Sequence, residues 1–334
     1  MDDPSRFSPQ RRTSTSELIG PQIPSDNTAT RPAPIALFIY KRPVHLRATL
    51  ASLAACPEAS QSALHVFADA AKLPEHAEAV AEARAVARAA TGFSSVAIVE
   101  REENWGLARS ITHGVADMCQ RFGRVIVVED DLIVGRHFLR FLNAGLDRYA
   151  GDERVMQVSG YAYPIEANAD RKAGFLPMVS CWGWATWERA WAQFDPTMSA
   201  FAGIERDANA RHRFNLDGAY DYWGMAQDQR RGIVDSWGIR WQMSLFARNG
   251  LALYPPVSLV ENAGVDATGT HGSGQKAFQR KIADHDYGAD IGWPDSIAVD
   301  DAMFARVKQL LRGHRSSWRE LAVRTLRRAW PKHR

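Results

Sequence analysis

Residues 124–132 have the sequence Arg-Val-Ile-Val-Val-Glu-Asp-Asp-Leu, and this stretch decides the fold. Its four consecutive β-branched apolar residues predict a strand that is buried on both faces, as in a parallel sheet. Three carboxylates, Glu129, Asp130 and Asp131, follow the strand directly. Open α/β sheets bind their ligands at the carboxyl ends of their strands, so the sequence predicts a ligand site here.

Crowded carboxylates at such an edge repel one another and lose hydration, so they favour a bound cation. Mg²⁺ or Mn²⁺, bridging one or two carboxylates to substrate phosphates, is the natural candidate. The alternative is structural: Asp130 or Asp131 caps a following helix, since Leu139 and Leu142 continue as a periodic apolar pattern. A cap needs one acid, whereas the sequence supplies three.

The chain before this strand alternates short apolar runs with helical patterns. We expect strands at residues 34–40, 64–69 and 96–99, and helices at 45–55, 75–90 and from about 109 to 122. This alternation predicts an α/β fold, a mostly parallel sheet flanked by helices and joined by right-handed crossovers. The sequence contains neither a G-x-G-x-x-G after the first strand nor a P-loop motif, so phosphate binding would depend on a metal ion.

The second half of the chain is rich in aromatic residues. Strands are expected at 155–160 and 251–254. Residues 182–191 predict the start of a helix, with three tryptophans on one core-facing side: Trp184, Trp187 and Trp191. Trp182 and Gly183 precede this pattern, and an aromatic plane beside a missing side chain suits the lining of a sugar site.

Three further segments of the second half are candidates for function. Residues 195–232 are polar and predict a mobile lid or an acceptor-facing segment. Asp235 opens a helix, either as a simple N-cap or as a functional acid. A glycine-rich loop at 262–272 closes on His271, which is either structural or a ligand for a metal or phosphate.

Composition favours a globular protein with an ample core, since the 334 residues are 46% apolar and 24% charged. Residues 1–33 lack periodicity and predict a disordered leader. Residues 302–334 hold ten Lys or Arg against one acid, Glu320, which leaves a mildly acidic body that does not suit nucleic acid binding. The basic amphipathic tail, residues 291–334, suits an anionic membrane surface or a solvated helix packed on the body.

The cysteines and the hydropathy pattern bear on location. Cys56, Cys119 and Cys181 are odd in number and lack metal-type spacing, which predicts buried thiols in a reducing compartment. The sequence has neither an 18-residue apolar run nor an apolar signal segment. We therefore expect a cytoplasmic protein, free or peripheral on the inner face of the membrane.

Residues 34–275 resemble the GT-A glycosyltransferases. The pattern is closest to the group containing the N-acetylglucosaminyltransferase that starts complex N-glycan branching, and to bacterial family-2-like sugar transferases. Five short blocks carry the resemblance, namely the E-D-D form of the D-x-D motif at 129–131, the A-R pair at 108–109, the G-W block at 182–184, the D-D-W position at 235–237 and the S-H-G-like loop at 269–272. The resemblance implies a Rossmann-like GT-A sheet with a nucleotide-sugar half, residues 34–150, and an acceptor half, residues 151–290.

The resemblance also implies roles for individual residues. Asp131 and His271 would approach the metal, Mn²⁺ or Mg²⁺, while Asp130 would contact the ribose and Glu129 the donor sugar. Four residues would hold the nucleotide: Tyr40, Arg42, Asp69 and Arg109. Without the resemblance, the basic loop that contains Arg42 is as readily explained as a solvated turn.

The catalytic base is where the chain departs from the family pattern. The family places an acid directly before the tryptophan, and this chain has Ser236 there, so the role moves to Asp235. The implied reaction is a metal-dependent, inverting transfer from a nucleotide sugar, a UDP-sugar above all, to a hydroxyl of a glycan, glycolipid or small molecule, as in bacterial polysaccharide synthesis. The alternatives are a sugar-phosphate nucleotidyltransferase and a carbohydrate-binding protein with a degenerate site.

Overall fold

The computed structural model describes residues 31–166, 172–265, 282 and 291–313. The chain divides into two units, residues 1–31 and 32–334, and the fold below belongs to the second. The expected leader lies almost wholly outside the described residues. So do His271 and the part of the basic tail after residue 313.

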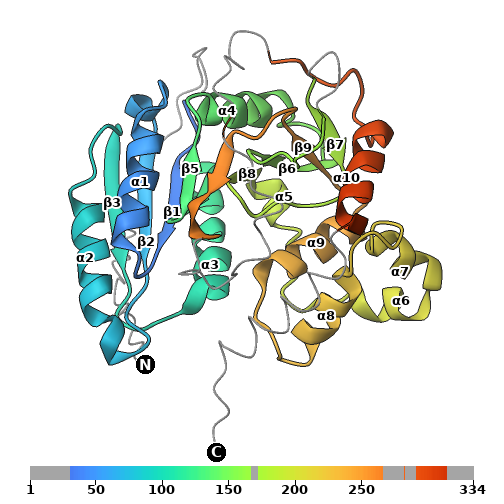
Figure 1. Ribbon diagram of the computed structural model, residues 1–334, viewed down its shortest axis with the longest axis horizontal. Helices are drawn as coiled ribbons and strands as arrows, with labels where there is room; N and C mark the ends of the chain where they lie inside the picture. Colours follow the sequence, from blue (N-terminus) through green and yellow to red (C-terminus); the bar gives the residue numbers. More distant parts are fainter. Residues whose placement is uncertain (1–30, 167–171, 266–281, 283–290, 314–334) are drawn as a thin grey trace, which may run out of the picture. The chain divides into compact units, whose positions relative to one another are not determined.

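An eight-stranded mixed sheet forms the centre of the fold (Figure 1). Its order is β3-β2-β1-β4-β8-β6-β9-β7, with the bounds β1 (Ile35–Ile39), β2 (Ala63–Ala68), β3 (Ser95–Glu100), β4 (Arg124–Glu129), β6 (Val155–Ser159), β7 (Gly174–Leu176), β8 (Trp184–Trp187) and β9 (Leu251–Tyr254). Strands β3, β2, β1 and β4 are parallel neighbours, as are β6 and β9, while β8 and β7 run antiparallel to their neighbours. The predicted α/β class and mostly parallel sheet are confirmed.

Helices cover the sheet, and their bounds are α1 (Pro43–Ala54), α2 (Ala77–Arg88), α3 (Gly106–Phe122), α4 (Phe138–Arg148), α5 (Glu188–Trp191), α6 (Phe201–Arg206), α7 (Ala208–Phe214), α8 (Tyr222–Arg230), α9 (Trp237–Ala247) and α10 (Asp301–Gly313). The α1 and α2 helices pack on each other, and α3 packs on β1 and β4. The strand order runs outward from β1 to β3 and then returns to β4 beside β1. This reversal makes the gap between β1 and β4 a topological switch point.

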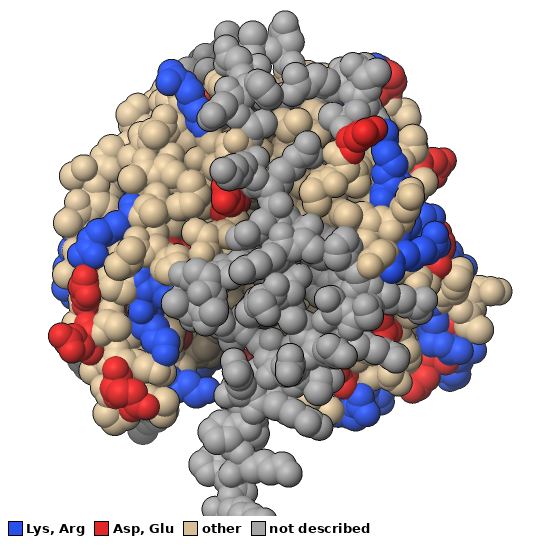
Figure 2. Space-filling view, in the orientation of Figure 1, with Lys and Arg blue, Asp and Glu red and all other residues tan. Residues whose placement is uncertain are grey.

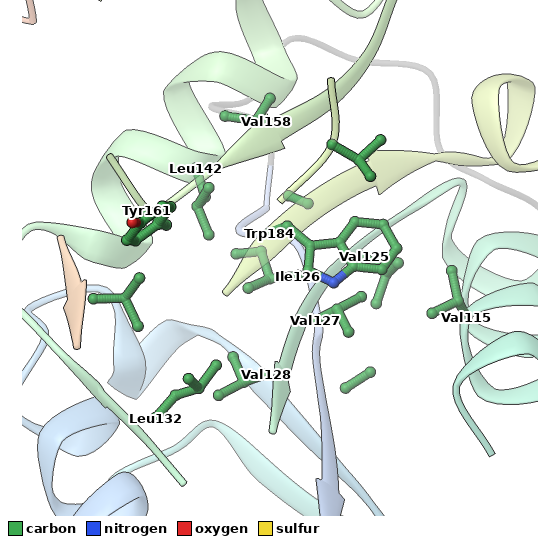
Figure 3. Close-up of a cluster of buried hydrophobic side chains, with 14 of the residues drawn as sticks. Val115, Val125, Ile126, Val127, Val128, Leu132, Leu142, Val158, Tyr161 and Trp184 are labelled. Atoms are coloured by element: carbon green, nitrogen blue, oxygen red, sulfur yellow. The ribbon is translucent and has the colours of Figure 1, made fainter. Parts of the chain in front are cut away.

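The core is built around β4, whose four apolar residues are at most 1% exposed, as the sequence predicts. Figure 3 shows Val115 of α3 on the side of Val125, and Leu142 of α4 on the other side of the strand. Trp184 of β8 is fully buried beside them. Both faces of the strand are therefore covered, which is why its sequence shows no polar alternation.

The predicted helix over the tryptophan segment is wrong. Residues 184–187 form β8, which pairs antiparallel with both β4 and β6, and only the four-residue α5 follows it. The core position of Trp184, Trp187 and Trp191 is confirmed, since each is at most 6% exposed. Aromatic residues suit a strand that is packed on both sides, and that packing comes from distant parts of the chain.

The polar segment at 195–232 contains three short helices, α6, α7 and α8, which lie together in Figure 1. They share a small apolar cluster with α9, formed by Met198, Phe201, Ile204, Phe214, Ala226, Ile239 and Met243. On the face shown in Figure 2, Lys and Arg side chains are interspersed with Asp and Glu among the described residues.

Two predictions on cysteines and membrane spans can be compared with the structure. Cys56 and Cys119 are buried as expected, Cys181 is half-buried, and all three thiols are free. Among the described helices, none combines the length and the apolar composition that crossing a membrane requires.

Candidate functional site

The candidate site lies where the chain leaves β1 and β4 at the switch point. These two strands are parallel neighbours, with Phe38 opposite Glu129. The residues that follow them, 40–42 and 129–131, therefore emerge side by side at one edge of the sheet. The structure brings together the two segments that the sequence singled out independently.

Two of the three acids are hydrogen-bonded to the segment after β1. The Arg42 guanidinium donates from Nη1 to Asp131 Oδ2 over 2.6 Å, and both side chains are 16% exposed. The backbone N–H of Tyr40 donates to Asp130 Oδ2 over 2.9 Å. The Thr49 hydroxyl donates to the Asp130 carbonyl over 2.9 Å, which ties the same turn to α1.

The helix-cap alternative for these acids is wrong. Asp130 and Asp131 lie in the turn between β4 and β5 (Leu132–Val134), and α4 begins only at Phe138. The N-cap of α4 is His137, which makes no side-chain cap hydrogen bond. The acids are thus held at the sheet edge for another reason than helix capping.

Burial and mutual repulsion disfavour the ionised forms of Glu129 and Asp130. Dehydration raises the pKa of Asp130 to about 6, with the charge of Asp131 as the next contribution. The pKa of Glu129 lies well above its usual value because of burial first and then its two acidic neighbours, while Arg42 acts in the opposite direction. A cation placed beside these carboxylates would therefore be bound favourably.

A second short strand leads the chain past Asp131. β10 (Val260–Asn262) pairs antiparallel with β5, and the N–H of Ala263 donates to the Asp131 carbonyl over 2.8 Å. A Cβ at Gly264 would lie 2.2 Å from Asp131 Oδ2 and 2.8 Å from Arg42 Nη1. A larger residue at 264 would therefore displace the Arg42–Asp131 pair, and the sequence alone did not reveal this close approach.

On the nucleotide side, Tyr40 belongs to a hydrogen-bond chain with a histidine that sequence reasoning missed. The Tyr40 hydroxyl lies 2.7 Å from His76 Nδ1 and accepts the N–H of Lys72 over 2.9 Å. His76 Nε2 lies 2.6 Å from Lys41 Nζ. Burial raises the pKa of the Tyr40 phenol, so that it stays neutral and can donate.

Asp69 holds the start of α3 in this structure. Its carboxylate accepts hydrogen bonds from the backbone N–H groups of Trp105 (2.8 Å) and Gly106 (2.9 Å) and from the Asn104 amide (2.9 Å). The N-cap residue, Trp105, makes no side-chain cap hydrogen bond, so Asp69 satisfies these N–H groups in its place. The nucleotide-binding role expected for it stays a prediction.

Arg109 stacks on Trp105, with its guanidinium carbon 3.9 Å from the ring centroid. A second guanidinium, that of Arg101, lies 3.6 Å from the centroid of the same ring. The sequence signal for this was a tryptophan with arginines four residues before and after it. Both cations lie at the edge where β3 ends, near Asp69.

Trp182 and Gly183 lie at the same edge of the sheet, because β8 runs antiparallel to β4 and begins opposite its end. The Trp182 ring contacts the Tyr161 ring edge-on at 4.8 Å. Gly183 has φ +60°, and a Cβ there would lie 2.7 Å from the Phe138 ring. The packing of Phe138 thus accounts for the glycine, and a sugar-lining role stays a prediction.

The expected N-cap role of Asp235 is wrong, because Ser236 caps α9 by accepting the N–H of Ile239. The Asp235 side chain is 67% exposed and pairs with Arg240 at 2.5 Å. Cys181 nevertheless links the amino end of α9 to Glu129. A Cβ on Gly238 would be 3.0 Å from the Cys181 sulfur, and the charge of Glu129 acts on the Cys181 thiol.

Sequence reasoning missed a cluster of tyrosines around Cys181, here called the tyrosine cluster: Tyr163, Tyr220, Tyr222 and Tyr254. Burial raises the pKa of each phenol, and the four groups and Cys181 act on one another electrostatically. Burial also raises the pKa of Cys181 to about 12. The phenols and the thiol themselves are therefore uncharged at physiological pH, while the carboxylates of Asp221 and Glu129 act on Tyr220 and Cys181.

Within the described residues, no three His, Cys, Asp or Glu side chains are arranged to hold a metal ion. The chemistry of the acids still fits one, because Mg²⁺-like ions keep several waters and take one or two carboxylates together with substrate phosphates. Asp131, partly exposed and already facing a cation, is the residue suited to that contact.

No family model matches the sequence, and no curated protein matches it. Two solved structures are similar in fold. Mouse xyloside xylosyltransferase 1 in its apo form has 12% identity and a TM-score of 0.34, covering 64% of this chain and 81% of that one. Mannose-1-phosphate geranyltransferase from Thermus thermophilus has 12% identity and a TM-score of 0.36, covering 87% of this chain and 99% of that one. At these values neither likeness supports a conclusion about activity.

Proposed function

We propose that the protein is a metal-dependent glycosyltransferase that moves a sugar from a nucleotide sugar, with UDP favoured, to a hydroxyl acceptor with inversion. One observation carries this: three crowded carboxylates and Arg42 meet at the switch point of a mostly parallel sheet. That is where open α/β sheets bind nucleotides. The sequence has no glycine-rich phosphate loop, so a metal ion bound by the carboxylates would take its place in binding the diphosphate.

The donor half would hold the nucleotide through residues that follow β1 or begin α3. The segment after β1 offers Tyr40 and Arg42, and the start of α3 offers Arg109. When Asp131 turns to a metal-bound diphosphate, Arg42 is freed to contact a phosphate oxygen, because guanidinium groups pair with phosphate as well as with carboxylate. Asp130 and Glu129 would contact the ribose and the donor sugar.

A divalent ion, Mn²⁺ or Mg²⁺, would neutralise the charge that develops on the departing diphosphate. Asp131 would hold it, with His271 as a further candidate that lies outside the described residues. The protein's own contribution is to fix the nucleotide so that the anomeric carbon faces the acceptor.

The acceptor would lie toward the second half of the same edge, beside Trp182 and the tyrosine cluster. Inversion requires a base for the acceptor hydroxyl, which is typically worth about 10²–10⁴-fold in rate. Asp235 is our candidate, and to serve it would have to leave Arg240, the partner that it has in this structure. A glycan or a lipid-linked acceptor suits this half, and the basic tail would bring the enzyme to an anionic membrane.

The first experiment measures UDP binding by calorimetry with and without Mn²⁺. We expect Mn²⁺ to raise the affinity of the wild type, and Asp131→Asn to abolish that increase. Asp117→Asn is the matched control, because Asp117 also pairs with an arginine, Arg121 at 3.0 Å, but on the surface of α3. Equal UDP affinity with and without Mn²⁺ in the wild type would refute the proposal.

The two rival functions give different products. A nucleotidyltransferase releases pyrophosphate from a nucleoside triphosphate, whereas a glycosyltransferase releases a nucleoside diphosphate from a nucleotide sugar. A donor screen that reads released UDP or GDP beside released pyrophosphate separates them. A carbohydrate-binding protein would release neither.

A further inference from the structure

The loop between α7 and α8 contains three consecutive residues in the left-handed backbone region. Leu216 has φ 51°, Asp217 has φ 54° and Gly218 has φ 74°. Only glycine adopts this region freely, and a branched apolar side chain such as that of Leu216 does so under strain. Leu216 is only 2% exposed, so the strained turn is fixed by its surroundings rather than left free.

The C-terminal helix of the described chain pins this turn. Lys308 of α10 places Nζ 2.6 Å from Asp217 Oδ2, and Arg312 donates from Nη2 to the Asp217 carbonyl over 3.3 Å. The Lys308 side chain is 19% exposed and that of Asp217 40%. An ion pair of this exposure stabilises a fold little, so its main effect is on the local geometry of the turn.

The pinned turn leads directly into the tyrosine cluster. The Tyr220 N–H donates to the Asn215 carbonyl over 3.1 Å, and the Trp223 N–H donates to Asn215 Oδ1 over 2.7 Å. Tyr220 and Tyr222 contact each other edge-on, with ring centroids 4.6 Å apart. Asn215 therefore fixes the backbone of the segment that carries both rings, and the left-handed residues 216–218 lie between Asn215 and that segment.

The same helix also borders the rest of the cluster. Met303 and Val307 of α10 line a small cavity together with Tyr163 and Tyr254. These contacts come from the side of α10 that enters the core, since Val307 is fully buried and Met303 is 6% exposed. α10 thus meets the tyrosine cluster twice, once by direct packing and once through the turn.

We propose that Lys308 is a positioning residue for the acceptor half of the site: its ion pair with Asp217 holds the left-handed turn that places Tyr220 and Tyr222 around Cys181. The assignment to an acceptor rests on the function proposed above. The phenol rings suit the apolar face of an uncharged sugar, and their hydroxyls suit its hydroxyls. Because α10 belongs to the basic tail, this contact connects the described part of the tail to the acceptor half.

The first test does not depend on enzymatic activity. It measures how fast 5,5′-dithiobis(2-nitrobenzoic acid) labels Cys181 in the full chain, with the labelled cysteine identified by mass spectrometry. We expect Lys308→Met and Asp217→Asn each to raise the rate about five- to tenfold, the double variant to be no faster than either, and Lys308→Arg to restore the wild-type rate. Asparagine tolerates the left-handed region, so Asp217→Asn removes the charge without adding backbone strain.

Lys172→Met is the matched control, because Lys172 forms a similar exposed pair with Asp295 at 2.9 Å. It should label like the wild type. Equal labelling of Lys308→Met and wild type, or a double variant much faster than both single ones, would overturn the proposal.

The second test uses p-nitrophenyl pyranosides as acceptor probes with the donor found in the screen. We expect Lys308→Met to raise the acceptor KM several-fold while kcat and the Mn²⁺-linked UDP affinity stay within twofold. An unchanged acceptor KM overturns the acceptor assignment. If the enzyme transfers no sugar at all, the proposed function fails, and the labelling experiment alone decides whether the ion pair positions the tyrosines.

Discussion

The two halves of the sheet edge differ in charge. The half formed after β1 and β4 carries charged groups in direct contact, among them Arg42 and Asp131. The half formed by the ends of β6 and β9 and the start of β8 carries phenols and a thiol that are uncharged, because burial raises their pKa values. One continuous edge thus offers two environments, one suited to a diphosphate and one suited to hydroxyl groups.

If the proposed function holds, this difference would let a single sheet separate the donor from the acceptor by their chemistry. Repelling carboxylates favour a cation and its phosphates, and they disfavour any further negative group. Neutral aromatic walls favour an uncharged partner instead. Substitutions in each half of the edge test this contrast.

The largest effect is expected for Asp131→Ala. Loss of the carboxylate that we propose to hold the metal beside the departing diphosphate should lower donor turnover about 100-fold or more, the scale seen when one stabilising electrostatic group is removed. Released nucleoside diphosphate is the measurement, at saturating Mn²⁺. Tyr220→Phe in the neutral half serves as the comparison and should cost less than tenfold; equal losses in the two variants would contradict the division of the edge.

Gly264→Ala should come next. Its Cβ would meet Asp131 Oδ2 at 2.2 Å, so the Arg42–Asp131 pair must move. We expect about tenfold weaker Mn²⁺-linked UDP binding, and a loss of about 1–3 kcal/mol in the free energy of unfolding, as for other overpacked sites. Calorimetry and urea unfolding measure the two effects.

Gly151→Ala is the control for this substitution, because a Cβ there would have no neighbour within 4 Å. It should leave both quantities near their wild-type values. A Gly264→Ala variant that behaved in the same way would show that the backbone after β10 does not support the acid cluster.

Asp130 gives a pH dependence that can be measured in EDTA, without metal. Its pKa is raised to about 6 from 3.8, so the native state holds the proton more tightly than the unfolded state. The stability associated with this group is present below pH 3.8 and is lost as the pH rises through about 6, on the order of 3 kcal/mol in total.

Asp130→Asn, which keeps an acceptor for the Tyr40 N–H, should remove this loss. The variant should therefore gain stability relative to the wild type as the pH is raised from about 4 to about 7. Urea unfolding of both proteins at each pH measures this difference. A constant difference over this range would mean that Asp130 is not dehydrated as described.

The smallest effect concerns the thiols. Cys181 is half-buried, whereas Cys56 and Cys119 are buried, so a thiol reagent should label Cys181 first in the native protein. All three should react more slowly than free cysteine, because their pKa values are raised by burial and the thiolate is the reactive form. Labelling of Cys119 before Cys181 would contradict the described packing.

The elements that the sequence predicted well are those with local signals. The four apolar residues of β4 and the acids after it specify a buried strand and its edge, and alternation of strands and helices specifies a parallel sheet. The meeting of Arg42 with Asp131 was not predicted, and the strand order explains it, since the two segments end neighbouring strands.

What the sequence could not predict depends on contacts between distant residues. Trp184 and Trp187 are spaced as on a helix face, and only pairing with β4 and β6 makes them a strand. Asp235 and Ser236 are both good N-cap residues, and the backbone selects Ser236. The role of Asp69 at α3, the glycine at 264 and the tyrosine cluster all require the folded chain.

The reversal of β8 within the sheet has a consequence for how this molecule can vary. In a fully parallel sheet, loops at one edge all follow strands, but here residues 177–183 enter the same edge before a strand begins. Length changes in that entry would reshape the neutral wall while β1 and β4 kept their alignment. Under the proposed function, acceptor preference could thus diverge among variants of this fold while the proposed nucleotide-binding residues stay in place.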